Sequence, residues 1–289
     1  MHQPESASET VAAGEPRMPV RRRLLIAGAL TAAGLALDAY GLEPAEVLIT
    51  RTDLPVPGLD RAFDGMTIAQ VSDLHLPGNQ RAAKATLALI QRERPDVVVC
   101  TGDMVEQADA LGMLTEFVQQ ARGRRATVGI FGNWERMARI SDAVLADAYR
   151  RAGATMLQEA RMVLREGGGR LGIAGLGDAL YREPVLGPQL VDPSLSDADL
   201  YLVHCPAYAD QLPDVPRKPA ALLSGHTHGG QIRVPGWVPY TPRGSGRFVE
   251  GWYRDAHAPL YVSRGIGTVE IPARFCCPPE LPIFTLRPA

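Results

Sequence analysis

The stretch TIAQVSDLH at residues 67–75 decides the fold, because it runs from a short strand directly into a polar motif. The apolar and β-branched residues at 67–71 indicate a strand. Asp73 and His75 follow it immediately. Side chains at the carboxyl ends of neighbouring strands in an open α/β sheet converge in one crevice, where ligands bind. We therefore expect similar motifs to follow other strands of this chain.

Two further strand ends repeat this arrangement. Residues 96–100 lead into Gly102 and Asp103, and residues 127–131 lead into the string GNWE at 132–135. The amphipathic spacing at 81–92, 111–120 and 141–151 predicts helices between the strands, with Ser141 as the N-cap of the third. Short apolar runs predict strands in the second half of the chain at 171–176, 200–203, 221–224, 231–234, 260–263 and 283–286. The pattern favours one α/β domain in which a second, mixed sheet packs on the first.

Histidine placement is the next signal. Four of the six histidines lie in motifs: His75, His204 in VHCP at 203–206, and His226 and His228 in GHTHGGQ at 225–231. A lone histidine beside an apolar run is more often a satisfied core residue. Two imidazoles crowded among three glycines build a poor core but admit an ion and its ligand. Taken together, the motifs indicate a metal site.

The donor types suggest which metals would bind. Asp73 and His75, two residues apart in a segment expected to be extended, can face the same ion. Asp103 after Gly102 suits a bridging carboxylate, and Asn133 after Gly132 offers an amide oxygen to a second ion. Carboxylate with imidazole suits Mn, Fe, Zn or Ni better than Ca or Mg. Taken alone, Asp-x-His is a weak signal, because Asp at a strand end often only forms a turn.

With these motifs in place, the chain resembles the calcineurin-like metallophosphoesterase superfamily from about Gly41 to Ala289. The strings YGLEP at 40–44, HTHGGQ at 226–231, LYVSRGIG at 260–267 and PE at 279–280 are similar to its bacterial subfamily with an N-terminal export signal or membrane anchor. The resemblance implies a four-layer α/β/β/α sandwich of two mixed sheets. It also implies two divalent transition metal ions, one held by Asp73, His75, Asp103 and His228, the other by Asp103, Asn133, His204 and His226.

Trp134 departs from the family pattern, in which the residue after the Asn is usually a His that contacts phosphate and protonates the leaving group. An indole N–H has no usable acidity near neutral pH, so general acid catalysis worth ~10² to 10⁴-fold is at risk. Phosphate and phenolate leave well without an acid, so Trp134 favours pyrophosphate or aryl ester substrates. Its ring can also stack on a base, cover a lipid chain or only pack the cavity wall.

Three arginines near the motifs are weaker candidates for phosphate contacts. Arg136 and Arg139 follow the third motif, and Arg233 follows the fifth. A guanidinium can bind phosphate through two parallel hydrogen bonds. The competing interpretation is that each arginine is a solvated surface residue.

The N-terminus indicates export or membrane attachment. Residues 1–20 are rich in Glu, Ser, Ala and Pro and predict a disordered lead. Residues 21–41 read as a signal sequence or membrane anchor, with Arg21-Arg22-Arg23 before an apolar run at 24–37. The run spans roughly 21 Å as a helix, short of the ~30 Å hydrocarbon core, which favours a signal region. No small-x-small cleavage site follows, so an uncleaved anchor is the alternative, and a buried helix with a basic cap is a third interpretation.

The arginines also resemble a twin-arginine export signal, which implies the twin-arginine machinery as a partner. The positive-inside rule places the domain predicted at residues 42–289 on the extracytoplasmic side of the membrane, or outside the cell if the signal is cleaved. The formal net charge of −2 provides no electrostatic footprint for nucleic acid.

The sequence therefore predicts an exported two-metal phosphoesterase. We expect it to hydrolyse a phosphodiester or pyrophosphate with a metal-activated hydroxide as nucleophile, and a lipid-linked or envelope-derived substrate fits the expected location. Asn133 is the expected catalytic residue, and Trp134, Arg136 and Arg233 are the expected substrate contacts. The alternative is a metal-binding protein with little or no catalysis, because Trp134 replaces the acid.

Overall fold

The computed structural model describes residues 20–289, and the lead predicted for residues 1–20 lies outside that range apart from Val20. The chain divides into two compact units, one that ends at Leu37 and one from Asp38 to Ala289. The first contains helix α1 (Val20–Leu37). Among the described residues, one helical stretch, Arg21–Ala45, is long and apolar enough to cross a membrane.

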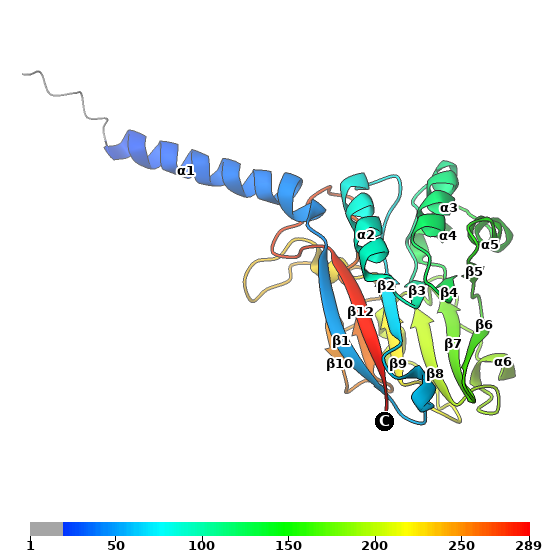
Figure 1. The fold of residues 1–289 in the computed structure, drawn as a ribbon. Helices are drawn as coiled ribbons and strands as arrows, with labels where there is room; N and C mark the ends of the chain where they lie inside the picture. Colours follow the sequence, from blue (N-terminus) through cyan, green and yellow to red (C-terminus); the bar gives the residue numbers. More distant parts are fainter. Residues whose placement is uncertain (1–19) are drawn as a thin grey trace, which may run out of the picture. The chain divides into compact units, whose positions relative to one another are not determined.

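The second unit contains two six-stranded sheets (Figure 1). Sheet one has the order β1-β12-β2-β3-β4-β5, with strands Leu48–Val56, Glu280–Pro288, Thr67–Val71, Val97–Cys100, Ala126–Gly129 and Thr155–Met156. Sheet two has the order β10-β11-β9-β8-β7-β6, with strands Gly251–Tyr253, Leu260–Val262, Ala221–Ser224, Ala198–Val203, Gly169–Gly177 and Ala160–Glu166. Both sheets are mixed. In sheet one, β2, β3, β4 and β5 run parallel, and β12 pairs with β2 in an antiparallel arrangement. In sheet two, β7, β8, β9 and β11 run parallel, while β6 pairs antiparallel with β7 and β10 pairs antiparallel with β11.

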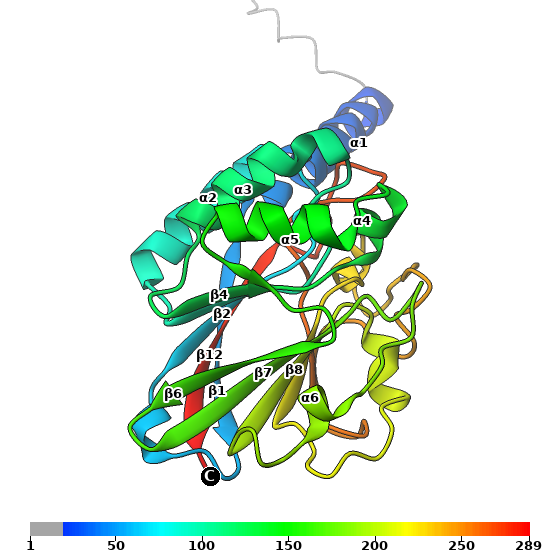
Figure 2. The same ribbon diagram turned by 90° about the vertical axis from the view of Figure 1, so that its right-hand side faces the viewer.

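Helices cover the outer faces of the two sheets, as predicted (Figure 2). Helices α2 (Gln80–Glu93), α3 (Leu111–Gln120) and α5 (Asp142–Arg151) lie on sheet one, and the short helix α6 (Pro188–Val191) lies beside sheet two. The Ser141 hydroxyl accepts a hydrogen bond from the Val144 amide, which confirms the predicted N-cap of α5. The remaining α-helix, α4, spans Asn133–Met137. The order helices, sheet, sheet, helix is the predicted α/β/β/α sandwich.

Strand β3 shows how the sequence alternation fills both cores. Val97 and Val99 belong to the apolar cluster between the sheets, while Val98 and Cys100 belong to the cluster beneath the helices. Side chains alternate across a strand, so a continuous apolar run supplies both faces of a fully covered sheet. Gln70 joins the sheets with a polar contact, because its amide donates to the Thr101 hydroxyl and the Ser224 carbonyl, both 2.9 Å away.

The structure corrects one strand and adds four. Residues 231–234, predicted as a strand, form only isolated bridges, because Gln231 has a positive φ and Pro235-Gly236 turns the chain immediately afterwards. The added strands β1, β5, β6 and β10 include the edges of both sheets. Their side chains are mostly partly exposed, so they lack the continuous apolar runs of the central strands.

The segment before β1 is packed into the second unit. The Ala39 carbonyl accepts the Arg274 amide at 2.9 Å, and Arg81 donates to the Gly41 carbonyl at 3.0 Å. The buried Glu43 carboxylate accepts the amides of Cys276 and Cys277. The compact second unit therefore includes residues from Asp38 onward.

Candidate metal centre

The five motifs meet at the carboxyl ends of strands β2, β3, β4, β8 and β9. All seven expected ligands are buried there, none more than 7% exposed: Asp73, His75, Asp103, Asn133, His204, His226 and His228. We call these seven side chains the ligand cluster. Parallel strands bring their carboxyl ends to one edge of a sheet, which explains why motifs up to 155 residues apart converge.

One half of the ligand cluster joins Asp73, His75 and His228, whose donor atoms lie within 4.8 Å of one another. His75 Nε2 lies 3.0 Å from His228 Nε2. His228 Nε2 lies 3.6 Å from Asp73 Oδ1. Two imidazole nitrogens and a carboxylate that point at a common centre form a donor set suited to a divalent transition metal.

The other half joins Asn133, His204 and His226 through Asp103. His204 Nε2 lies 3.0 Å from Asp103 Oδ2 and 3.1 Å from Asn133 Oδ1. The His204 and His226 rings are 5.0 Å apart. Asp103 Oδ2 is also 3.8 Å from His75 Nε2, so this carboxylate lies between the two halves, where the sequence expected a bridging ligand.

The buried polar atoms also fit a metal. Within the described part of the chain, Asp73 Oδ2 and His228 Nδ1 are buried without a hydrogen-bond partner. Burial alone would raise the pKa of Asp103, but the charge and hydrogen bond of His204, together with the charges of His75 and His226, outweigh it and hold the pKa at about 2. A buried, ionised carboxylate beside imidazoles is what a divalent cation would neutralise.

The backbone that presents the ligands is unusual and corrects the extended conformation expected around Asp73 and His75. Both residues have left-handed φ values of 54° and 52°, and Asp103, His226 and His228 are also left-handed. Such conformations cost of order 1–3 kcal/mol each in non-glycine residues and cluster at functional sites. The glycines are required for close approach, because a Cβ at Gly132 would lie 2.2 Å from Asp103 Oδ1.

Glu135 organises this backbone, a role that the sequence analysis missed. The side chain is fully buried and accepts amide hydrogen bonds from Gly132, Asp103, Met104 and Val105 at 2.6–3.3 Å. Burial, with the nearby Asp103 charge, raises the pKa of Glu135 to about 7. The sequence signal that could have identified Glu135 is its place at the third position of α4, where an acidic side chain closes a capping box.

Glu106 was also missed. Its carboxylate lies 2.9 Å from His75 Nδ1. Burial would lower the pKa of His75, but the hydrogen bond to Glu106 and the charges of Asp103 and Asp73 raise it instead. A second partner on the other ring nitrogen fixes the tautomer and orientation of metal-binding histidines. His204 Nδ1 and His226 Nε2 have such partners in the carbonyls of Thr101 and Arg243.

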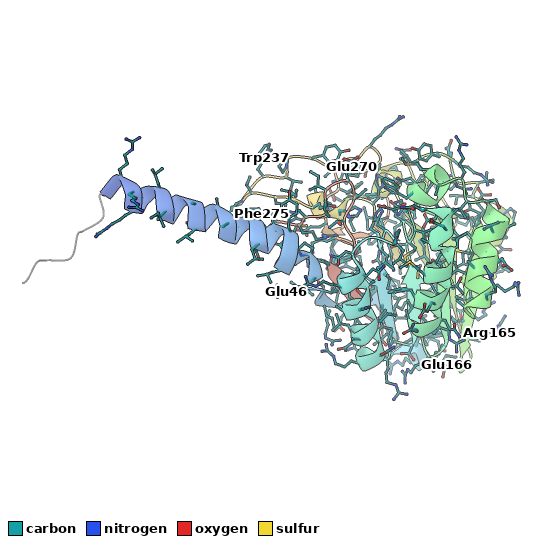
Figure 3. The ribbon with its side chains drawn as sticks, turned by 90° about the horizontal axis from the view of Figure 1, so that it is seen from above. Glu46, Arg165, Glu166, Trp237, Glu270 and Phe275 are labelled. Atoms are coloured by element: carbon teal, nitrogen blue, oxygen red, sulfur yellow. The ribbon has the colours of Figure 1, made fainter. Side chains whose placement is uncertain are left out.

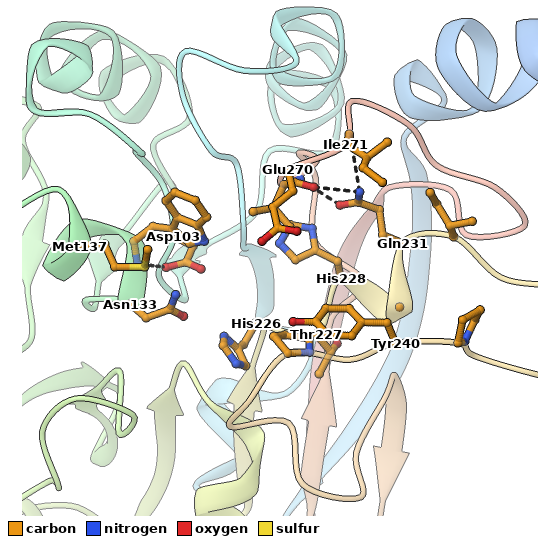
Figure 4. A pocket seen from close by; sticks show the side chains of 16 residues that line it. Asp103, Asn133, Met137, His226, Thr227, His228, Gln231, Tyr240, Glu270 and Ile271 are labelled. Carbon is orange, nitrogen blue, oxygen red and sulfur yellow. Dashed lines mark hydrogen bonds between the residues drawn. The ribbon is translucent and has the colours of Figure 1, made fainter.

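A cavity of about 470 Å³ opens beside the ligand cluster (Figure 4). Asp103, Asn133, His226 and His228 line one end. The lining also includes apolar side chains, which we call the apolar wall: Trp134, Met137, Ile232, Val269 and Ile271. The half-buried Trp134 packs edge-on against His75, with ring centroids 5.6 Å apart. Trp134 therefore lines the cavity directly beside a candidate ligand.

The arginines expected near phosphate are engaged elsewhere. Arg136 pairs with Asp142 and lies 3.4 Å from Asp178, with its guanidinium 4.0 Å above the Phe131 ring. Arg233 pairs with Glu250 at 2.6 Å. Among the described residues that line the cavity, neither arginine is present.

Comparisons with known proteins identify a family and several relatives. A family model described as calcineurin-like phosphoesterase matches residues 66–230. The chain is 32% identical over 270 residues to the uncharacterized metallophosphoesterase YkuE of Bacillus subtilis, covering 91% of this chain and 93% of that protein. It is 27% identical to the phosphodiesterase YaeI of Escherichia coli, covering 69% and 73%. It is 25% identical to the UDP-2,3-diacylglucosamine pyrophosphatase LpxG of Chlamydia trachomatis, covering 84% and 90%.

Proposed function

Because the chain belongs to the calcineurin-like phosphoesterase family and is a metal-dependent phosphoesterase, we propose that it hydrolyses a phosphodiester or a pyrophosphate. The convergence of the seven buried ligands at the end of the cavity is the observation that supports this proposal. The names of the relatives YaeI and LpxG describe these two reaction types.

The two halves of the ligand cluster support a binuclear centre. Asp73, His75 and His228 would hold one ion, Asn133, His204 and His226 the other, and Asp103 would contact both. When bound, Mn, Fe, Zn or Ni ions would neutralise phosphate charge and lower the pKa of the attacking water. The amide nitrogen of Asn133 is the donor that this chain can turn towards a phosphate oxygen.

Trp134 limits the leaving group in this proposal. The indole faces the cavity beside His75 and has no proton to give near neutral pH. An alkoxide leaves poorly without protonation, whereas a phosphate or a phenolate leaves without it. Substrates with such leaving groups therefore fit the site best.

The N-terminal unit supports a membrane-associated protein. Arg21–Ala45 can act as a signal anchor by length and composition, and Arg21-Arg22-Arg23 would remain cytoplasmic by the positive-inside rule. We propose that the catalytic unit lies on the extracytoplasmic side and that the twin-arginine machinery exports it. Replacement of Arg22 and Arg23 by lysine should retain the protein in the cytoplasm, and unchanged fractionation would contradict this route.

Hydrolysis of bis-p-nitrophenyl phosphate tests the proposed reaction. The full chain, stripped of metal and reloaded with Mn, Fe, Zn or Ni, should release p-nitrophenolate in a metal-dependent way. The full chain is preferable to a fragment from residue 42, because Ala39 and Gly41 bond to the catalytic unit. Absence of turnover in protein shown to bind two ions would instead favour a metal-binding protein without efficient catalysis.

A further inference from the structure

The cavity beside the ligand cluster combines metal-binding donors with apolar side chains. Met137 of the apolar wall lies beside Asp103 and Asn133, and Ile271 lies across the cavity near Glu270 (Figure 4). Tyr240, Pro239 and Pro242 continue the apolar lining towards solvent. A phosphate held at the ligand cluster would therefore have the apolar wall next to its adjoining arm.

The wall is fixed to the metal-binding loop by one side chain. Gln231, three residues after His228, donates from Nε2 to the carbonyls of Val269 and Ile271 at 3.1 and 2.9 Å. Its Oε1 accepts the Val269 amide at 2.9 Å. Gln231 is only 9% exposed. These three hydrogen bonds hold the 269–271 loop at a fixed distance from the ligands. Val269 and Ile271 are therefore held in place in the wall.

The charges around the cavity disfavour a polyanion. No Lys or Arg occurs among the lining residues that the structure describes. Glu270 adds a negative charge to the lining and forms no ion pair with any described residue. Sites for nucleoside polyphosphates usually provide guanidinium or ammonium groups for the phosphates beyond the reacting one. The described lining of this cavity provides no such group, so positive charge for a phosphate would come from bound metal ions.

Exposed aromatic residues extend the apolar lining beyond the cavity. Tyr240 is 66% exposed and Trp237, on the same loop, is 63% exposed. Trp237 and Glu270 lie on one side of the domain, away from the β6–β7 turn at Arg165 and Glu166 (Figure 3). Exposed aromatic and apolar side chains at the mouth of a site mark contact with an apolar partner or ligand.

From these observations, and resting on the proposed phosphoesterase function, we propose that the substrate carries a lipid-like alkyl chain on the arm next to the scissile phosphorus. The chain lies along the apolar wall and leaves the cavity past Tyr240. A nucleoside arm is the poorer fit, because apart from the indole N–H of Trp134 the five wall side chains carry no strong hydrogen-bonding group for a sugar, and Glu270 repels further phosphates. Burial of the chain supplies the binding free energy, at ~25 cal/mol per Å² of apolar surface.

A substrate series with a constant leaving group tests this proposal. p-Nitrophenyl phosphodiesters with methyl, butyl or octyl second arms are compared with bis-p-nitrophenyl phosphate and thymidine 5′-p-nitrophenyl phosphate, using the full chain in lipid nanodiscs. We expect kcat/KM to rise up to ~4-fold per added methylene while the chain fits the cavity, as ~0.8 kcal/mol per buried methylene implies. The octyl ester should exceed both the aryl and the thymidine esters by at least ~10-fold.

A matched pair of variants locates the effect. Ile271→Asp puts a charge on the wall at a residue 47% exposed, and Val144→Asp makes the same kind of change at a residue 45% exposed on α5, away from the cavity. Ile271→Asp should lower kcat/KM for the octyl ester ~10-fold more than for the methyl ester. Val144→Asp should leave the ratio unchanged, and the milder Ile271→Ala should lower it ~3-fold.

The outcomes separate this proposal from the proposed function. Equal hydrolysis of all arms, or preference for the thymidine or aryl ester, overturns the alkyl arm and leaves the phosphoesterase intact. Failure to hydrolyse any ester overturns both. A chain-length effect that Ile271→Asp does not reduce would show that the chain binds elsewhere, which also overturns the assignment to this wall.

Discussion

The ligand cluster and the apolar wall face the same cavity but are built differently. The ligands are nearly inaccessible, five of the seven have left-handed backbone, and Glu135 and Glu106 hold their loops from behind. In the wall, Met137 and Ile271 are about half exposed, and the 269–271 loop is tied by the amide of Gln231. The difference teaches that the ligand cluster depends on many mutually supporting contacts. Side chains of the apolar wall can be replaced one at a time without disturbing those contacts.

Asp103→Asn should have the largest effect on the ligand side. The substitution removes the charge that lies 3.0 Å from His204 and 3.8 Å from His75, so both halves of the cluster lose affinity for metal. We expect turnover of bis-p-nitrophenyl phosphate to fall by more than ~10²-fold, beyond the 10–100-fold typical of outer-shell changes. Metal content measured on the same samples should fall as well. Asp142→Asn, on the surface, is the control, and near wild-type turnover of Asp103→Asn would contradict the shared role.

Trp134→His changes a residue that belongs to the wall and borders the ligands. A histidine there can protonate an alkoxide, so esters with alkyl leaving groups should gain ~10²-fold in turnover. Esters with p-nitrophenolate as leaving group should change less than about 3-fold, because phenolate needs no acid. Parallel assays of the two leaving-group classes measure this. An equal change in both classes would show that Trp134 only shapes the wall.

Glu106→Ala tests whether the ligand cluster depends on outer contacts. Loss of the carboxylate 2.9 Å from His75 Nδ1 frees the ring to rotate and to change tautomer. Metal affinity should fall ~10- to 100-fold. Calorimetric titration of the stripped protein with Mn or Zn measures this, and Glu106→Gln should restore part of the affinity because it keeps an acceptor. Unchanged affinity in Glu106→Ala would mean that burial alone orients His75.

Glu135→Gln should destabilise the fold as well as the site. The substituted amide brings a donor into a space where four backbone amides already point, so at least one buried hydrogen bond is lost. We expect a loss of ~2 kcal/mol in the free energy of unfolding, measured with urea on metal-free protein. Glu116→Gln, on the exposed side of α3, is the matched control. Equal stability of the two variants would contradict the role of Glu135 in holding the ligand loops.

Asp96→Asn should give the smallest effect, at the opposite end of the strand that leads to Asp103. Burial would raise the pKa of Asp96, but hydrogen bonds from Thr67 and the charge of Arg124 lower it below the usual 3.8. The lowered pKa stabilises the folded protein above pH 3.8, and this stabilisation is lost as the pH falls through the pKa that Asp96 has in the folded state. Asp96→Asn should therefore lose ~1 kcal/mol at pH 7, and the gap to wild type should close at lower pH. If the difference in unfolding free energy between wild type and Asp96→Asn instead widens on acidification, the stabilising role of ionised Asp96 is contradicted.

The sequence predicted the central architecture because local patterns encode it. Strands at 67–71 and 221–224 and the helix at 111–120 match their predicted bounds, since apolar runs and helical spacing are local signals. The segment at 231–234 looked like a strand, but its backbone bonds to Phe275 and the Gln231 side chain bonds to the backbone of Val269 and Ile271. Contacts with distant residues determine the conformation of this segment, and a local sequence pattern does not contain those contacts.

The sequence by itself identified the seven candidate ligands and Trp134, because each is stated by residue type and order within a short motif, and the resemblance that those motifs carry implied the sandwich fold. Only the tertiary structure assigned Glu135 and Glu106, which bond to partners 30–32 residues away, and only it diverted Arg136 and Arg233 from the cavity. The physical reason is that a carboxylate or guanidinium takes whichever partner packing brings within hydrogen-bond distance. That choice depends on how distant strands and helices meet rather than on the neighbouring sequence.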